Sequence, residues 1–176
     1  MSFTKERKID ILEQFVGGRY IDEDTIKLFS DKFERVEDTI YRGMPFPKHL
    51  IKEGFIVEEW HGSSHWSLDF NVSREVFSKD KFNISEDYCG ELALELGLSY
   101  DEVYDNVFVP VVFELNGVSS GIRLYNIVKD LDLVSRFYKE KEITTIGIDT
   151  KIKSFEKKYD SCGGYYLIKV EEILKS

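Results

Sequence analysis

The sequence predicts an α+β fold in which helices come first and strands follow. In the first 36 residues, apolar side chains recur at steps of three and four, which is typical of amphipathic helices. From residue 106 onward, runs of β-branched and aromatic residues are separated by glycines and charged residues, which is typical of strands. This order of elements belongs to the α+β class.

The size and composition of the chain indicate one domain with one sizeable core. The chain has 176 residues, of which 42% are hydrophobic and 14% aromatic, and this composition argues against disorder. The formal net charge of −9 argues against a protein that binds nucleic acid, because such binding depends on clustered Lys and Arg. An anionic ligand would need a local pocket with its own arginine.

The cysteines and the apolar runs bear on where the protein acts. Cys89 and Cys162 are far apart and lack metal-ligand spacing, so we expect no disulfide and a reducing compartment. The N-terminus has no apolar signal-peptide core, and the longest apolar run, residues 107–113, is too short to span a bilayer. We therefore expect a soluble, cytoplasmic protein with a single domain over residues 1–176.

Five segments carry helical signals: 3–16, 22–36, 71–78, 86–97 and about 130–137. The first has an apolar stripe that ends at Gly17 and Gly18. The second follows from apolar residues at three- and four-residue steps. Ser85 is placed to cap the fourth segment, and Gly97 is placed to end it.

Eight segments are predicted to be strands: 39–44, 55–60, 64–69, 106–115, 121–128, 141–147, 150–159 and 165–174. The first is expected to end at Pro45, which cannot donate to a ladder. Residues 106–115 are apolar enough for a central strand, but Pro110 suggests an edge or a bulge.

Three short stretches could carry chemistry, although each also has an ordinary structural explanation. Arg42 in "YRG" ends a predicted strand, where surface ion pairs are common. Ser67 precedes a predicted short helix, where serine commonly serves as a cap or turn residue. Glu140 and Glu142 point to the same face of a strand, which is unfavourable unless something binds beside them.

Taken together and in order, these stretches resemble the Arg–Ser–Glu signature of the mono-ADP-ribosyltransferase family. The matching stretches are "YRG" (41–43), "HWSLDFNVSREVF" (65–77) and "EKEIT" (140–144). The family includes bacterial toxins and enzymes that some bacteriophages carry into their hosts. The serine motif of the family is often Ser-Thr-Ser, whereas this chain has Ser67-Leu68-Asp69, so a role for the third hydroxyl is not carried over.

The resemblance covers roughly residues 39–173 and implies a fold as well as an activity. It implies a mixed, mostly antiparallel β core of two sheets, with residues 1–38 as a helical cap and 39–176 as the NAD-binding catalytic core. It also implies NAD as the substrate and no metal. ADP-ribose would pass to a protein acceptor, such as a host protein, in the cytoplasm of a bacterial or phage-infected cell. No role for nucleic acid or membrane is implied.

The resemblance also implies roles for the residues that match the motifs. Glu142 matches the catalytic glutamate, which stabilises the positive charge on ribose as nicotinamide leaves. Glu140 matches the residue that engages the acceptor, and a glutamate there is what arginine-modifying members carry. Ser67 would hydrogen-bond Glu142 or the nicotinamide ribose.

The remaining matched residues would bind NAD. Arg42 would grip the phosphates, and the Gly43 backbone would approach the nicotinamide amide, where a side chain would obstruct it. Trp66 and Phe77 would contact the nicotinamide ring, although both are equally well explained as core aromatics.

Other functions stay open at this point. Water could be the acceptor, which would make the protein an NAD glycohydrolase. The chain could also be a catalytically silent binding module on the same fold, or a plain α+β adaptor with a charged strand edge. A zinc site at His49, His61 and His65 is not expected, because no fourth ligand stands at recognisable spacing.

Overall fold

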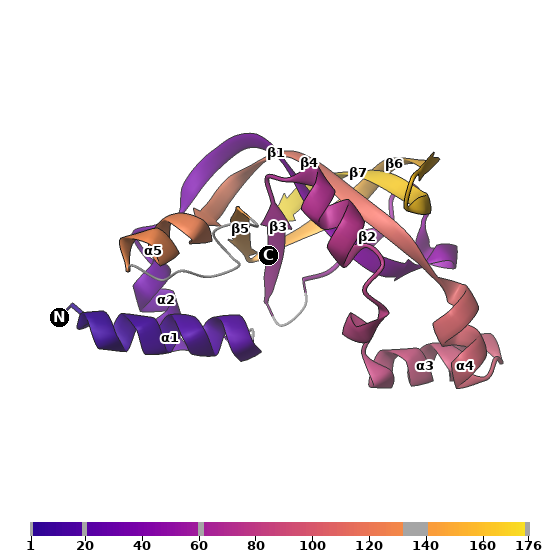
Figure 1. Cartoon of the computed structure of the whole chain (residues 1–176), viewed down its shortest axis with the longest axis horizontal. Helices are drawn as coiled ribbons and strands as arrows, with labels where there is room; N and C mark the ends of the chain where they lie inside the picture. The colour runs from indigo at the N-terminus through magenta and orange to yellow at the C-terminus, as the bar shows by residue number, and fades with distance from the viewer. Residues whose placement is uncertain (1, 19–20, 60–61, 132–140, 175–176) are drawn as a thin grey trace.

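The computed structural model describes residues 2–18, 21–59, 62–131 and 141–174 (Figure 1). Its strands are β1 (Glu34–Pro47), β2 (Ile56–Val57), β3 (Ser63–Ser67), β4 (Phe108–Arg123), β5 (Glu142–Ile146), β6 (Ile148–Asp160) and β7 (Gly163–Leu174). Its α-helices are α1 (Lys5–Gly18), α2 (Glu23–Phe29), α3 (Glu86–Leu96), α4 (Tyr100–Glu102) and α5 (Leu124–Asp130). Shorter helical turns are η1 (Lys48–Leu50), η2 (Val72–Phe77), η3 (Lys81–Asn83) and η4 (Val103–Val107).

The strands of the described residues form one seven-stranded sheet in the order β1-β3-β5-β4-β7-β6-β2. Only β4 and β7 pair in parallel, and the other pairs are antiparallel. The α+β class and the mostly antiparallel core are therefore confirmed. A division into two sheets is not, because β4 pairs with β1, β5 and β7 and so joins all the strands in one network.

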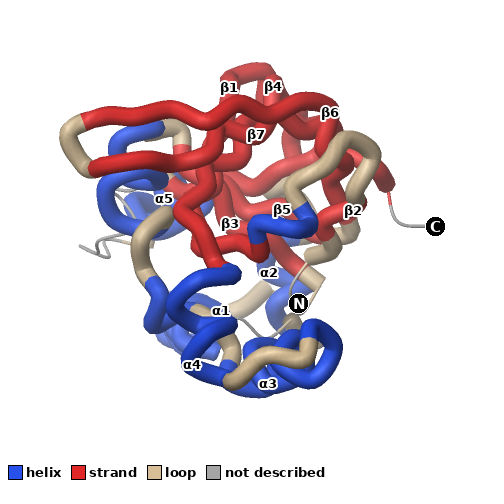
Figure 2. Tube along the Cα trace, turned by 90° about the vertical axis from the view of Figure 1, so that its right-hand side faces the viewer, coloured by secondary structure: helices blue, strands red, loops and turns tan. Residues whose placement is uncertain are grey.

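The helices form two groups, α1, α2 and α5 towards one end of the sheet and α3 and α4 towards the other (Figure 1), and Figure 2 views the molecule from the α3–α4 end. Helices α1, α2 and α5 share a buried apolar cluster that includes Leu12, Phe15, Phe29 and Leu124. At the other end, α3, α4 and η4 pack around Cys89 and the start of β4. Among the described residues, none of the helices is both long and apolar enough to cross a bilayer.

Three helical predictions are confirmed, including the short helix at 71–78, which forms η2, and one is wrong in its second half. Helix α1 matches the predicted segment 3–16 but begins at Lys5 and includes Gly17 and Gly18, which were expected to end it. Helix α3 begins after the N-cap Ser85 and ends at Gly97, whose φ is +67°. The predicted helix over 22–36 ends at Phe29, and β1 begins at Glu34. Val36 has the spacing of a helical stripe, but it pairs with β4 and is fully buried in the sheet core.

Contrary to the prediction from the sequence, Pro45 does not end its strand and Pro110 does not mark an edge strand. Strand β1 runs through Pro45 to Pro47, and Pro45 lies opposite Pro110 on β4. Strand β4 is an inner strand rather than an edge, and its pairing with β7 begins only at Val111. Pro110 therefore removes no hydrogen bond from that ladder.

Three further predictions change in extent or type. The strand predicted at 55–60 is reduced to β2, and residue 60 lies outside the described residues. The strand predicted at 121–128 continues β4 only to Arg123, and α5 follows because its buried residues lie on one helical face against α1 and α2. Most of the helix predicted near 130–137 lies outside the described residues, and α5 ends at Asp130.

The segment η2 is held very close to β1. A Cβ atom on Gly43 would lie 1.8 Å from the backbone oxygen of Ser73, so only glycine allows this approach. On the other side, the buried Arg74 donates two hydrogen bonds of 2.8 Å to the carboxylate of Asp160. The guanidinium of Arg74 also lies 4.3 Å above the ring centroid of Tyr165. Together these contacts pin η2 between β1 and the β6–β7 hairpin.

We predict that Gly43→Ala destabilises the fold, because η2 would have to move away from β1. The melting temperature should fall by roughly 5–10 °C. Gly90→Ala is the matched control, because a Cβ there meets nothing within 4 Å and Gly90 lies inside α3. A thermal unfolding experiment in which both variants melt like wild type would contradict this account of η2.

The Arg74–Asp160 pair also predicts how stability depends on pH. Hydrogen bonding to Arg74 is the main cause that lowers the pKa of Asp160 in the folded protein. A lowered pKa contributes stability at pH values above the unfolded pKa, about 4, and that stability is lost as the pH falls through the folded pKa. Asp160→Asn should therefore melt several degrees below wild type at pH 7, with a smaller difference at pH 3. Asp31→Asn, at an exposed carboxylate, should show neither effect.

Candidate active site

The register of three strands brings distant parts of the sequence into one row. Tyr41 on β1 lies opposite Ser67 on β3, and Ser67 lies opposite Glu142 on β5. Arg42 follows Tyr41 directly, so the three motif residues Arg42, Ser67 and Glu142 sit on adjacent strands. Arg42 and Glu142, which are 100 residues apart along the chain, are thus brought close together by the strand order.

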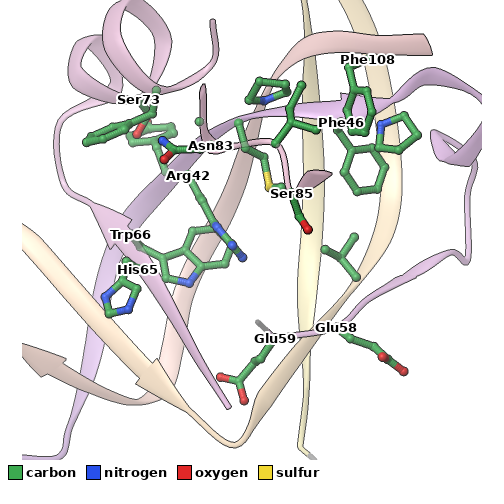
Figure 3. A pocket seen from close by; sticks show the side chains of 18 of the residues that line it. Arg42, Phe46, Glu58, Glu59, His65, Trp66, Ser73, Asn83, Ser85 and Phe108 are labelled. Atoms are coloured by element: carbon green, nitrogen blue, oxygen red, sulfur yellow. The ribbon is translucent and has the colours of Figure 1, made fainter. Parts of the chain in front are cut away.

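A cleft of about 840 Å³ opens beside this row (Figure 3). Strands β1 and β3, η2, and residues 55–59 and 83–85 form its walls, and Phe108 also lines it. Six of the predicted site residues line the same cleft: Arg42, Gly43, Trp66, Ser67, Phe77 and Glu142. The seventh, Glu140, lies outside the described residues.

Arg42 and Trp66 bring polar donors to this cleft. The Nη1 group of Arg42 donates to Ser64 Oγ at 3.2 Å, and Figure 3 shows the guanidinium reaching into the cleft beside Trp66. Trp66 is only 4% exposed and belongs to the sheet core as well as to the cleft lining. Its buried Nε1 has no hydrogen-bond partner among the described residues. A buried indole N–H without a partner is costly, so it indicates a donor that a bound ligand can satisfy.

Glu142 is a buried carboxylate in contact with a histidine. It is 4% exposed, and its Oε1 lies 2.6 Å from Nδ1 of His65. The residue before it, Lys141, has a φ of +47°, which is rare for a non-glycine residue. Backbone strain of this kind is often found at functional sites, and here it sets how the chain enters β5.

Ser67 and Asp69 shape the turn that leads from β3 towards η2. Ser67 Oγ accepts a hydrogen bond of 2.9 Å from the backbone N–H of Asp69. Asp69 Oδ1 in turn accepts one of 2.9 Å from the N–H of Asn71. The aspartate that departs from the Ser-Thr-Ser pattern therefore has a local role as a turn residue.

The structure gives Gly43 a packing role, because its backbone lies against Ser73. The approach of this backbone to nicotinamide, which the resemblance implies, stays a prediction. That packing places η2, and with it Phe77, along the wall of the cleft. Phe77 is only half-buried there, so its ring is accessible from the cleft.

Two residues of the site were missed by the sequence reasoning. His65 pairs with Glu142, and the alternation of side chains along β3 could have placed it on the same face as Ser67. Glu59 lines the cleft while 9% exposed, and its Oε1 accepts a hydrogen bond of 2.9 Å from the N–H of Gly147. No local sequence signal marks Glu59, because its burial depends on the bend between β5 and β6.

The two histidines of the described residues have different surroundings. His49 is exposed on η1, His65 contacts Glu142, and His61 lies outside the described residues. Within the described part of the chain, no three His, Cys, Asp or Glu side chains gather as metal ligands would.

Comparison with solved structures identifies the fold. The crystal structure of the ADP-ribosyltransferase Vis in complex with agmatine superposes with a TM-score of 0.56 over 98% of this chain and 76% of that chain, at 16% sequence identity. This chain has the ADP-ribosyltransferase fold. The toxin Plx2a from Paenibacillus larvae, another ADP-ribosyltransferase, gives a TM-score of 0.49 at 15% identity, over 97% of this chain and 87% of that chain. By sequence, the chain matches no protein-family model and no curated protein.

Proposed function

We propose that the protein transfers ADP-ribose from NAD to an arginine side chain of a protein acceptor, with release of nicotinamide. One observation carries this proposal. On a chain with the ADP-ribosyltransferase fold, the residues that match the Arg–Ser–Glu signature, Arg42, Ser67 and Glu142, line a single cleft. This match supports the Arg–Ser–Glu class to which the phage and toxin enzymes belong.

The cleft has the size and the chemistry to hold NAD. Its volume of about 840 Å³ lies within the usual range for small-molecule sites, roughly 300–1,000 Å³. Arg42 supplies a guanidinium for the phosphates in a protein whose net charge is otherwise −9. The indole of Trp66 and the ring of Phe77 offer apolar contact to nicotinamide, and the Nε1 donor of Trp66 offers a hydrogen bond.

The chemistry is the cleavage of an N-glycosidic bond. The bond between C1′ of the ribose and the ring nitrogen of nicotinamide breaks, and its electron pair leaves with neutral nicotinamide. Positive charge develops on the ribose, and the carboxylate of Glu142 stabilises it by holding the 2′-hydroxyl. Ser67, the cross-strand neighbour of Glu142, helps to hold the carboxylate in place.

The acceptor is an arginine of another protein, such as a host protein in a bacterial cytoplasm. Its guanidino nitrogen forms the new bond to C1′ and gives up a proton to Glu140, which matches the acceptor-binding glutamate of the family. Agmatine, the ligand in the Vis crystal structure, is an alkylguanidine, so it supports a guanidinium acceptor on this fold.

The decisive test is release of nicotinamide from NAD by wild type and by Glu142→Gln, with agmatine as the acceptor. The variant keeps the shape of the side chain but loses its charge, so the rate should fall by about 100-fold or more. Glu91→Gln, on the exposed face of α3, is the control and should keep full activity. Equal rates in wild type and Glu142→Gln, or no release by wild type, would remove the basis of the proposed function.

Trp66→Phe tests whether the buried indole N–H serves the substrate. This change keeps an aromatic ring but removes the donor, so we expect NAD to bind about fivefold more weakly, in line with one neutral hydrogen bond of about 1 kcal/mol. Isothermal titration in the Glu142→Gln background prevents turnover during the measurement. An unchanged affinity would assign Trp66 to packing alone.

A further inference from the structure

His65 lies in direct contact with Glu142. Its Nδ1 lies 2.6 Å from Glu142 Oε1 and 3.2 Å from Thr144 Oγ1. Its Nε2 lies 3.3 Å from Ser63 Oγ. Both nitrogens of the imidazole are thus engaged by groups on β3 and β5, the two strands that present Ser67 and Glu142.

These contacts fit an imidazole whose Nδ1 carries a proton. A carboxylate only accepts, so Nδ1 carries a proton and donates to Glu142. In the neutral ring Nε2 then accepts from the hydroxyl of Ser63. The hydroxyl thereby helps to keep the proton on the nitrogen that faces Glu142, as a supporting partner does for a metal-ligating histidine.

The ring of His65 is also held by packing. Phe15, a fully buried residue of α1, lies with its ring centroid 5.5 Å from that of His65. Phe15 is itself fixed by an edge-to-face contact with Phe29 of α2 at 5.2 Å. Through Phe15, the N-terminal helices therefore contact the imidazole and have a direct structural link to the catalytic row.

We propose that His65 is a positioning residue that holds the carboxylate of Glu142 in the orientation needed for cleavage of the glycosidic bond. This inference rests on the proposed function. Glu142 enters β5 from a strained residue, Lys141, and its long side chain would otherwise choose among several rotamers. A hydrogen bond to a ring that is itself held at both nitrogens and by Phe15 leaves one orientation.

The role predicts a loss of turnover without a loss of substrate binding. His65→Leu removes the donor, and a carboxylate displaced by about 1 Å should reduce kcat by roughly 10- to 100-fold. KM for NAD should stay within about twofold, since His65 acts through Glu142 rather than on NAD. His65→Asn places an amide N–H near the position of Nδ1. Its kcat should therefore recover at least half of the decrease in log kcat that His65→Leu causes.

The experiment measures kcat and KM for nicotinamide release by wild type, His65→Leu, His65→Asn and Glu142→Gln, with agmatine as the acceptor. His49→Leu is the matched control, because His49 is exposed on η1 and outside the cleft lining. Melting temperatures of the same variants, and of the double variant His65→Leu with Glu142→Gln, are measured without NAD. The melting temperature of the double variant should fall by less than the sum of the decreases in the two single variants, because both changes remove the same contact.

The outcomes separate this inference from the proposed function. A His65→Leu enzyme that keeps its kcat, while Glu142→Gln is inactive, would overturn the positioning role and leave the proposed function standing. A raised KM with unchanged kcat, or no rescue by His65→Asn, would also overturn it. No turnover by wild type would overturn the proposed function itself, and with it any catalytic meaning of the pair.

Discussion

The close approach of η2 to β1 is the constraint on which the cleft depends. Only a glycine at position 43 lets the two backbones come so near, because a Cβ would lie 1.8 Å from the carbonyl oxygen of Ser73. The buried Arg74 holds the same segment from the other side through Asp160 and the ring of Tyr165. A buried charge is stable only when it is paired and hydrogen-bonded, so the β6–β7 hairpin and η2 stabilise each other. One wall of the cleft is thus set by contacts that need no ligand.

Strand register sets the part of the cleft that β3 and β5 line. Because Ser67 lies opposite Glu142, a shift of one residue along β3 or β5 would turn the catalytic candidates to the other face of the sheet. The register is secured by the buried pair Trp66 and Ile143, which lies one residue further along and points into the sheet core. The same core residues that stabilise the fold therefore set the positions of the polar groups. His65 contacts both Glu142 and Phe15, so it connects the cleft to the helices at the N-terminus.

Six of the residues that line the cleft could be predicted from the sequence because they belong to short local motifs, and α3 likewise carries its own cap and stop. The features that could not be predicted from the sequence depend on contacts between residues that are far apart along the chain. The buried Arg74 has the sequence context of a surface charge on a short helix, and its partner Asp160 is 86 residues away. Similarly, β1 begins at Glu34 because β4 offers it a partner, although the local spacing favours a helix. The alternation of side chains along β3 places His65 on the same face as Ser67, but its contact with Glu142 depends on the pairing of β3 with β5.

The central claim is that this cleft breaks the nicotinamide–ribose bond of NAD and passes ADP-ribose to a guanidinium. Mass spectrometry of wild-type protein incubated with NAD and agmatine tests it most directly, because substrate and both products are measured in one sample. The account predicts free nicotinamide and ADP-ribosyl-agmatine in equal amounts. Free ADP-ribose in place of the agmatine adduct would contradict the transfer to arginine, and intact NAD would contradict the account as a whole.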